Sequence, residues 1–375
     1  MSDIACNRGM EKIMDYTELK EFYNNKRVLI TGHTGFKGSW LCVILNGMGA
    51  KVAGYALEPP TNPSLFEILG LSDKIESHIG DIADLEELWQ VWDEFKPEIV
   101  IHMAAQPLVR ESYKNPVGTY LTNVMGTVNV MECVRRSDYV SSVVNVTTDK
   151  VYRNNEWDKG YVETDYLDGY DPYSNSKSCS ELVTHSYIQS FLAEKGIPVS
   201  TCRAGNVIGG GDFAADRIIP DCIRACFSGE PIVVRNPNST RPYQHVLEPL
   251  FAYLTVAMMQ SRDFALASNY NIGPNDDNCV TTGMLVDTFV DSWNSMINEG
   301  DNRAVRQDMS DGGPHEANFL KLDCTKLKKT FGWEPRWSVR ETISKIIEFE
   351  LLRKSGASSY ELETCMSRQI EEYVG

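Results

Sequence analysis

The sequence RVLITGHTGFKGSWLCVILNGMG (residues 27–49) joins a short β-branched strand to an apolar helix through a glycine-rich turn. The glycines Gly32, Gly35 and Gly38 follow the spacing G-x-x-G-x-x-G. Glycine at these points permits a tight turn and close approach of a pyrophosphate to the backbone, while the helix N-terminus supplies unpaired amides. The spacing alone fits a plain turn equally well. The flanking strand and helix, at the start of a βαβ series, favour a dinucleotide site.

From this turn onward the chain alternates short β-branched runs with amphipathic stretches of helical length. This alternation predicts an α/β fold with a doubly wound parallel sheet, with right-handed βαβ crossovers as the default topology. The expected strands are residues 27–31, 51–57, 74–79, 98–104, 141–148, 198–204 and 269–273.

The regular alternation fades after about residue 205, where loops rich in Gly, Pro and Asn separate shorter elements. We therefore expect a main Rossmann domain and a smaller, partly discontinuous substrate-binding domain. The expected divisions are a lead segment at 1–25, the Rossmann domain at 26–205 with 243–273 returning to it, and the substrate-binding domain at 206–242 and 274–375.

The composition excludes several classes of protein. A formal net charge of −16 over 375 residues disfavours nucleic acid and anionic lipid as partners. A small anionic ligand remains compatible, because it needs only a few well-placed cations. With no signal-peptide pattern and no stretch near 18 apolar residues, the chain is expected to be cytoplasmic.

The 10 cysteines are scattered and form no C-x-x-C pair, as expected of reduced, buried thiols. Cys222 and Cys226 have helical spacing, but no His or acid cluster accompanies them, so packing is favoured over metal binding. No metal site is predicted.

A Tyr-x-x-x-Lys pair, Tyr173 and Lys177, begins an expected long helix. Residues at i and i+4 share a helix face, so the ammonium can favour the phenolate and make the tyrosine a usable base. Alone, such a pair is usually a surface contact. Its position one element after a strand that ends in Thr148, Asp149 and Lys150 favours catalysis.

Taken in order, these motifs resemble the extended short-chain dehydrogenase/reductases over nearly the full length of the chain. Ala104-Ala105 after the strand at 98–104, and Asn123 in TNVMGT, complete the pattern. The resemblance implies NAD as the cofactor, with the two alanines lining it and Asn123 supporting the helix of the proton relay. The cofactor residues that it implies are Gly32, Thr34, Gly35, Phe36, Lys37, Gly38, Asp81, Ile82, Ala104, Ala105, Asn123, Tyr173 and Lys177.

The contact to the adenosine ribose is not evident. The acid that usually closes the second strand is missing, and Glu58 comes one or two residues late. NAD and NADP are therefore not distinguished at this position. Asp81 follows the expected strand at 74–79, and it either hydrogen-bonds an adenine edge or caps the next helix.

The residue after Thr148 separates dehydratases from epimerases in this family. Elimination of water needs a proton donor for the leaving 6-hydroxyl, and Asp149 is an acid in that position. The Thr-Asp-Lys run resembles the branch of nucleotide-sugar 4,6-dehydratases that acts on CDP-glucose. The segments similar to the same branch are residues 58–66, 104–110, 241–246 and 327–333.

The resemblance implies an internal redox cycle. Tyr173, aided by Lys177 and Thr148, removes the 4-hydroxyl proton as a hydride passes from carbon 4 of the sugar. Asp149 then protonates the leaving 6-hydroxyl, and the hydride returns to carbon 6. As a hypothesis, Lys150 removes the proton from carbon 5, which requires burial or Lys177 to depress its pKa.

Arg241 can bind a pyrophosphate oxygen pair in a bidentate manner, and the family position of Asn206 lies beside the sugar phosphates. In the alternative interpretation, Asn206 is a turn residue and Arg217 is a solvated charge on a helix. The expected substrate residues are Gln106, Arg110, Asn206, Arg217 and Arg241.

Three alternatives remain: a nucleotide-sugar 4-epimerase, a dehydratase of another sugar nucleotide, and a cofactor-binding regulator without turnover. The complete catalytic set argues against the regulator. The resemblance also implies a homodimer or homotetramer, with helices near 117–136 and 174–195 pairing across the interface.

Overall fold

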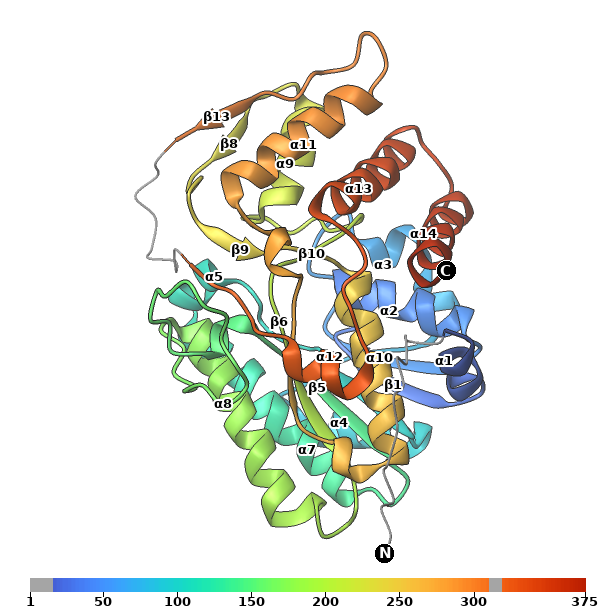
Figure 1. Cartoon of the computed structure of the whole chain (residues 1–375). Coiled ribbons are helices and arrows are strands. Elements are labelled where there is room, and N and C mark those ends of the chain that lie inside the picture. Colours follow the sequence, from blue (N-terminus) through green and yellow to red (C-terminus); the bar gives the residue numbers. More distant parts are fainter. Residues whose placement is uncertain (1–15, 310–318) are drawn as a thin grey trace, which may run out of the picture.

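The computed structural model describes residues 16–309 and 319–375, and a seven-stranded parallel sheet lies at its centre (Figure 1). The predicted doubly wound sheet is confirmed. The order of the strands reverses between β1 and β4, which creates the switch point where such sheets bind ligands. In spatial order the strands are β11 (Asn269–Ile272), β6 (Val199–Ala204), β5 (Ser142–Thr148), β4 (Ile99–His102), β1 (Arg27–Thr31), β2 (Lys51–Ala56) and β3 (Glu76–Ile79).

The central strands are apolar on both faces because helices cover both sides of the sheet. In β1, Val28 and Ile30 pack into one core and Leu29 into the core on the opposite face. In β4, Ile99 and Ile101 alternate with Val100 in the same way. Parallel strands with both faces buried read as continuous apolar runs, which is why the sequence predicted them well.

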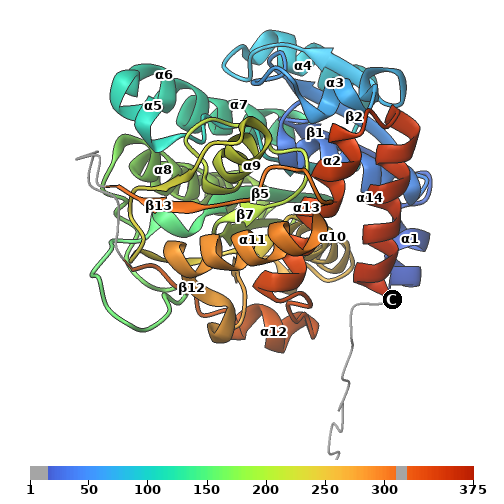
Figure 2. The same cartoon turned by 90° about the horizontal axis from the view of Figure 1, so that it is seen from above.

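One core lies between the sheet and the helices of its first face (Figures 1 and 2). These helices are α4 (Leu85–Phe95), α7 (Gly126–Arg136) and α8 (Pro172–Tyr187). The helix α8 begins after Asp171, whose carboxylate accepts the N–H of Ser174 at 3.0 Å. Pro172 fills the first helical position, where no backbone donor is required.

The opposite face carries the larger core, built on α2 (Phe36–Gly47) and α10 (Leu247–Arg262). Two helices from the ends of the chain, α1 (Tyr16–Tyr23) and α14 (Ser359–Val374), also pack here. The hydroxyl of Tyr23 donates to Leu254 O at 2.9 Å, and that of Tyr373 donates to Glu248 Oε2 at 2.7 Å. The division into two domains stays a prediction, since α14 of the smaller part packs on α2 of the larger one.

A third core, smaller than the one on α2 and α10, lies beyond the carboxyl edge of the sheet (Figure 1). Cys222 and Cys226 are buried in it. Its helices are α9 (Ile218–Ser228), α11 (Thr282–Met296) and α13 (Val339–Lys354). Its short strand pairs are β8 (Ile232–Val234) with β13 (Arg306–Asp308), β9 (Thr240–Pro242) with β12 (Cys279–Thr281), and β7 (Val207–Ile208) with β10 (Gln244–His245).

The first of the two long helices, expected near 117–136, is interrupted by one π-helical turn, and the second, expected near 174–195, ends in one. The first consists of α6 (Pro116–Tyr120), η2 (Leu121–Met125) and α7, and the second of α8 and η4 (Ile188–Leu192). The remaining short helices are α3 (Leu65–Ile68), α5 (Val109–Lys114), α12 (Thr325–Phe331), η1 (Leu71–Asp73), η3 (Asp149–Val151), η5 (Phe264–Leu266) and η6 (Asp276–Asn278). Within 16–309 and 319–375, none of the helices has the length and apolar character needed to cross a bilayer.

Candidate active site

The glycine turn between β1 and α2 is tightly packed. Gly32 has φ of +81°, and a Cβ there would lie 2.8 Å from Ala104 N. A Cβ on Gly38 would lie 2.2 Å from Gly32 O. Gly35 precedes α2 without a side-chain cap, so the first-turn amides of this helix have no side-chain acceptor. The turn therefore fits a dinucleotide pyrophosphate, which needs bare backbone and unpaired amides.

The space beside this turn is filled by His33, which sequence analysis did not select. A Cβ on Gly54 of β2 would lie 2.2 Å from the His33 ring, so only glycine fits there. His33 Nε2 lies 2.8 Å from Ser77 Oγ, and burial lowers the pKa of His33 to about 4. The hydroxyl of Thr34 donates to Leu57 O at 2.9 Å and ties the turn to the end of β2.

The loop after β3 contains Asp81 and Ile82. Asp81 Oδ1 accepts the N–H of Ala83 at 2.9 Å, whereas the N-cap of α4 is Asp84. The alternative role of Asp81 as the helix cap is therefore wrong, because the cap of α4 lies three residues later. Ile82 is buried against Gly126. The adenine contact of Asp81 stays a prediction.

Asn123 joins the loop after β4 to α8. Its Oδ1 accepts the N–H of Gln106 at 2.8 Å, and its Nδ2 donates to Gln106 O at 3.1 Å and to Ser176 Oγ at 2.9 Å. The preceding residue pair, Ala104-Ala105, begins this loop, and Ala104 N donates to Thr31 Oγ1 at 3.1 Å.

The side chain of Gln106 is turned into the protein. Its Nε2 donates to Thr119 Oγ1 at 2.9 Å, and its Oε1 accepts the N–H of Leu108 at 2.6 Å. Gln106 does not line the cavity described below, unlike the other expected substrate residues. Its polar atoms are satisfied by Leu108 of its own loop and by Thr119 of α6, which the sequence did not indicate.

Thr148, Tyr173 and Lys177 meet where β5 and α8 adjoin. Thr148 hydrogen-bonds Tyr173, which lowers the pKa of that phenol, but burial raises it to about 12. The ammonium of Lys177 donates to Val146 O at 3.0 Å, and burial lowers its pKa to about 8. Burial therefore opposes the phenolate expected from the Tyr–Lys spacing, and the role of this pair stays a prediction.

Asp149 is a buried carboxyl at the end of β5. Its Oδ1 accepts the hydroxyl of Thr148 at 2.9 Å, while its Oδ2 has no hydrogen-bond partner among the described residues. Burial raises the pKa of Asp149, although the charges of Lys150 and Arg241 lower it. A carboxyl in such surroundings keeps its proton to higher pH and is suited to proton donation.

A cavity of about 490 Å³ opens from these residues toward the smaller core. It brings together ten predicted residues, namely Phe36, Lys37, Arg110, Thr148, Asp149, Lys150, Tyr173, Asn206, Arg217 and Arg241. The sequence missed two further cations that line it, Lys114 and Arg235. No spacing signals either one, because both belong to surface elements that only folding brings to the cavity.

Cations outnumber acids around this cavity, although the whole chain carries a net charge of −16. Lys37 sits in the first turn of α2, and burial together with the charges of Lys177 and Arg217 lowers its pKa to about 7. An anionic ligand would relieve this repulsion. The cavity is therefore suited to a phosphorylated molecule.

Arg217 and Arg241 reach the cavity from the smaller core. Arg217 is the N-cap of α9 and donates to Asp212 Oδ2 at 3.1 Å. The alternative of a solvated charge within a helix is therefore wrong. Arg241 is 4% exposed, and its Nη1 donates to Thr240 O at 3.0 Å. Asn206 accepts the N–H of Gln244 with its carbonyl at 3.0 Å, leaving its side chain at the cavity.

The chain matches the family model described as GDP-mannose 4,6 dehydratase over residues 29–346. It is 47% identical to a CDP-glucose 4,6-dehydratase of Salmonella typhimurium, over 95% of this chain and 98% of the relative. A dTDP-glucose 4,6-dehydratase of Xanthomonas campestris is 25% identical, over 89% of this chain and 97% of the relative.

Solved structures share the fold at lower identity. A UDP-glucose 4-epimerase of Thermotoga maritima with UDP-glucose matches with a TM-score of 0.72 and 21% identity, covering 88% of this chain and 100% of that one. A dTDP-glucose 4,6-dehydratase of Bacillus anthracis in complex with NAD matches with a TM-score of 0.71 and 20% identity, covering 88% and 98%.

The glycine turn yields a direct test of its packing. We expect Gly38→Ala to lower the free energy of unfolding by about 1–3 kcal/mol, because the methyl group meets backbone that cannot yield locally. Gly47→Ala in the same helix, where a Cβ meets nothing within 4 Å, should be neutral or stabilising. Urea denaturation measures both, and equal stability of the two variants would contradict the packing argument.

Proposed function

Because the chain belongs to the GDP-mannose 4,6 dehydratase family of the extended short-chain dehydrogenase/reductases, we propose that it binds NAD and dehydrates CDP-glucose. The product is CDP-4-keto-6-deoxyglucose. The observation that carries the proposal is the buried Asp149 carboxyl, with one oxygen unpartnered among the described residues, beside Thr148 and Tyr173. The 47% identical relative, a CDP-glucose 4,6-dehydratase, supports this choice of nucleotide.

The residues of the glycine turn fit the cofactor. Gly32 and Gly38 leave no room for side chains, and the uncapped N-terminus of α2 offers its amides to a pyrophosphate. The Lys37 ammonium lies in the same first turn and adds positive charge. When bound, NAD supplies the acceptor for the hydride from sugar carbon 4 and returns that hydride to carbon 6.

In the oxidation step, Tyr173 accepts the proton of the 4-hydroxyl, directly or through Thr148. The raised pKa of Tyr173 means that the phenol must be acidified by surrounding positive charge before it acts as a base. The charge of Arg217 lowers this pKa, and we propose that Lys177, on the same helix as Tyr173, adds further positive charge.

In the elimination step, Asp149 donates its proton to the 6-hydroxyl, which leaves as water. Lys150, as the neutral amine, accepts the proton from carbon 5 and becomes an ammonium, and a double bond forms between carbons 5 and 6. The side-chain nitrogen of Lys150 makes no ion pair or hydrogen bond in the described ranges, so the side chain is available to a bound sugar. For the nucleotide diphosphate we propose Arg110, Asn206, Arg217 and Arg241, which line the cavity.

The function is tested by incubating the protein with NAD and, separately, CDP-glucose, dTDP-glucose, UDP-glucose and GDP-mannose. Mass spectrometry should detect loss of one water from CDP-glucose. We expect Asp149→Asn, which keeps the size but cannot donate the acidic proton, to lower kcat by about a hundredfold or more. If only another of these sugar nucleotides lost water, that molecule would be the substrate in place of CDP-glucose.

The same experiment decides between dehydration and epimerisation. A nucleotide-sugar 4-epimerase would change the stereochemistry at carbon 4 without a change of mass, and it would give Asp149 no role. If NMR showed an epimer and Asp149→Asn retained the activity of the parent chain, the dehydratase proposal would be wrong.

The role of Lys150 has its own test. We expect Lys150→Ala to abolish the exchange of solvent deuterium into carbon 5 of the sugar, because the group that removes this proton is gone. Lys159→Ala, an exposed lysine outside the cavity, should exchange at the rate of the parent chain. Normal exchange in Lys150→Ala would assign the base to another residue.

We also propose that the chain forms a homodimer through the two long helices at residues 116–136 and 172–192. Val117, Leu121 and Met125 lie at four-residue intervals along α6 and η2, and they are 78%, 48% and 46% exposed. Leu182 of α8 is 56% exposed. Spacing of four residues makes one apolar stripe, and a second copy related by a two-fold axis would bury it.

Introducing a charge into this stripe tests the proposed interface. We expect Leu121→Glu to convert the dimer to a monomer, because the carboxylate would be desolvated without a partner. Tyr360→Glu, on the exposed side of α14, should leave the mass of the particle unchanged. Light scattering after gel filtration measures both, and a monomeric parent chain would refute the interface.

A further inference from the structure

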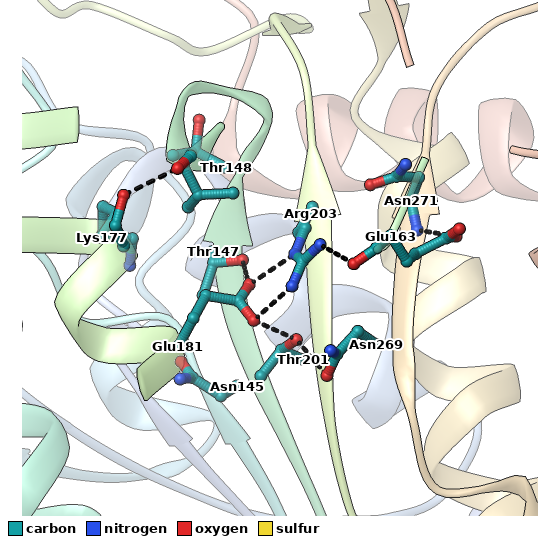
Figure 3. A network of polar contacts seen from close by, with 12 residues as sticks. Asn145, Thr147, Thr148, Glu163, Lys177, Glu181, Thr201, Arg203, Asn269 and Asn271 are labelled. Carbon is teal, nitrogen blue, oxygen red and sulfur yellow. Dashed lines mark hydrogen bonds and ion pairs between the residues drawn. The ribbon is translucent and has the colours of Figure 1, made fainter. Parts of the chain in front are cut away.

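A buried ion pair lies one helical turn beyond Lys177, between α8 and the sheet (Figure 3). Glu181 and Arg203 are 3% and 1% exposed. Arg203 Nε and Nη2 donate to the two oxygens of Glu181, both at 2.9 Å. Burying two charges is costly, and apolar residues of similar volume often stabilise a core equally well. Core stability alone therefore does not explain why this pair stands here.

The Glu181 carboxylate is the point where three elements meet. Thr147 of β5 donates to Oε1 at 2.5 Å, and Thr201 of β6 donates to Oε2 at 2.6 Å. With the two bonds from Arg203 of β6, the carboxylate accepts four hydrogen bonds, so its orientation is fully determined. Thr147 directly precedes Thr148, and the same carboxylate therefore holds both α8 and the strand end that carries the site.

The Nη1 end of the Arg203 guanidinium, which points away from Glu181, is also fixed by hydrogen bonds. Its Nη1 donates to Tyr152 Oη at 2.7 Å and to Glu163 O at 3.0 Å. The hydroxyl of Tyr152 in turn donates to Asn271 Oδ1 of β11 at 2.6 Å. The guanidinium cannot turn without breaking these contacts, and it thereby fixes Glu181 from the sheet side (Figure 3).

The helix α8 presents Tyr173, Lys177 and Glu181 at four-residue intervals, so all three lie on one face. Lys177 reaches Val146 O at 3.0 Å while Glu181 reaches Thr147 on the same strand. A slide or rotation of α8 along β5 would break both contacts together. The ion pair thus sets the position of the helix against the strand.

The charges that face Lys177 come from several elements. Glu181 on its own helix raises the pKa of Lys177, against the burial that lowers it to about 8. Lys37 of α2 contributes a like charge, and Asp149 lies at the end of β5. His102 of β4 is neutral, since burial lowers its pKa to about 3. Glu181 is the negative charge nearest to Lys177 along α8.

We propose that Glu181 is a positioning residue for the Tyr173–Lys177 pair. Arg203 holds its carboxylate from the sheet, and Thr147 connects it to the strand that carries Thr148. This inference rests on the proposed function, in which Tyr173 and Lys177 act on the bound sugar and cofactor.

The first test is Glu181→Gln, which keeps the shape of the side chain and removes its charge. We expect kcat to fall about tenfold, because the helix loses its fixed position against β5, with KM within about twofold. The affinity for NAD should also change its pH dependence. The family resemblance assigns Lys177 to the dinucleotide, where its protonated form donates a charge-assisted hydrogen bond and its neutral form does not, and without Glu181 it loses its proton at lower pH.

Thr147→Val and Thr201→Val form a matched pair of controls. Each removes one hydrogen bond to the same carboxylate and keeps its charge, and Thr201→Val also removes the 3.1 Å contact with Asn269 Oδ1, so we expect both to lower Tm by a few degrees. Thr147→Val should lower kcat several-fold, because β5 carries Thr148 and Asp149, whereas Thr201→Val should keep it within about twofold. Neither should move the pH dependence of NAD affinity.

The outcomes separate this inference from the proposed function. Equal kcat for the two threonine variants, or a parental pH dependence of NAD affinity in Glu181→Gln, would overturn the positioning role. A parent chain that turns over no sugar nucleotide would refute the proposed function instead, while calorimetry of NAD binding in Glu181→Gln still decides the role of Glu181. If Glu181→Gln fails to fold, the threonine pair decides it.

Discussion

The parallel hydrogen-bond register of the central strands is the constraint on which the site depends. Thr31 of β1 pairs with His102 of β4, and Thr148 of β5 pairs with Ala204 of β6. These strands therefore end at one edge, where the glycine turn, the loop of Asn123 and Gln106, the Thr-Asp-Lys run and the loop of Asn206 all begin. A slip of one residue in any strand would turn its side chains to the other face and dismantle this edge.

Burial then sets the chemistry of the groups at this edge. It raises the pKa of the Asp149 carboxyl and lowers those of the Lys37 and Lys177 ammonium groups, so the charged form of each is disfavoured. Opposite shifts in neighbouring groups are the usual way in which one site separates an acid from a base. Although the chain as a whole is negatively charged, its cavity holds several cations, and a bound anion would reduce the repulsion between them.

The predictions for strands and for individual polar residues both came from local sequence patterns. Such patterns define a buried strand well, but they do not define the role of a single polar residue. The strand β1 was predicted with its observed bounds because a β-branched run buried on both faces has a clear signature. Asp81 was assigned as an alternative helix cap and Gln106 as a substrate residue, yet Asp84 caps α4 and the side chain of Gln106 bonds to Thr119 of α6. Which of several nearby polar residues takes a role depends on backbone detail that spacing does not encode.

The order of amino acids alone settled the strand–turn–helix at residues 27–49 and the shared helix face of Tyr173 and Lys177, because both follow from backbone geometry over a few positions. The meeting of Glu181 with Arg203 and Thr147, the arrival of Arg235 at the cavity, and the packing of α14 on α2 were decided only by the tertiary structure. These contacts join residues far apart in the chain, and burial, which sets their pKa values, exists only once the whole core has formed.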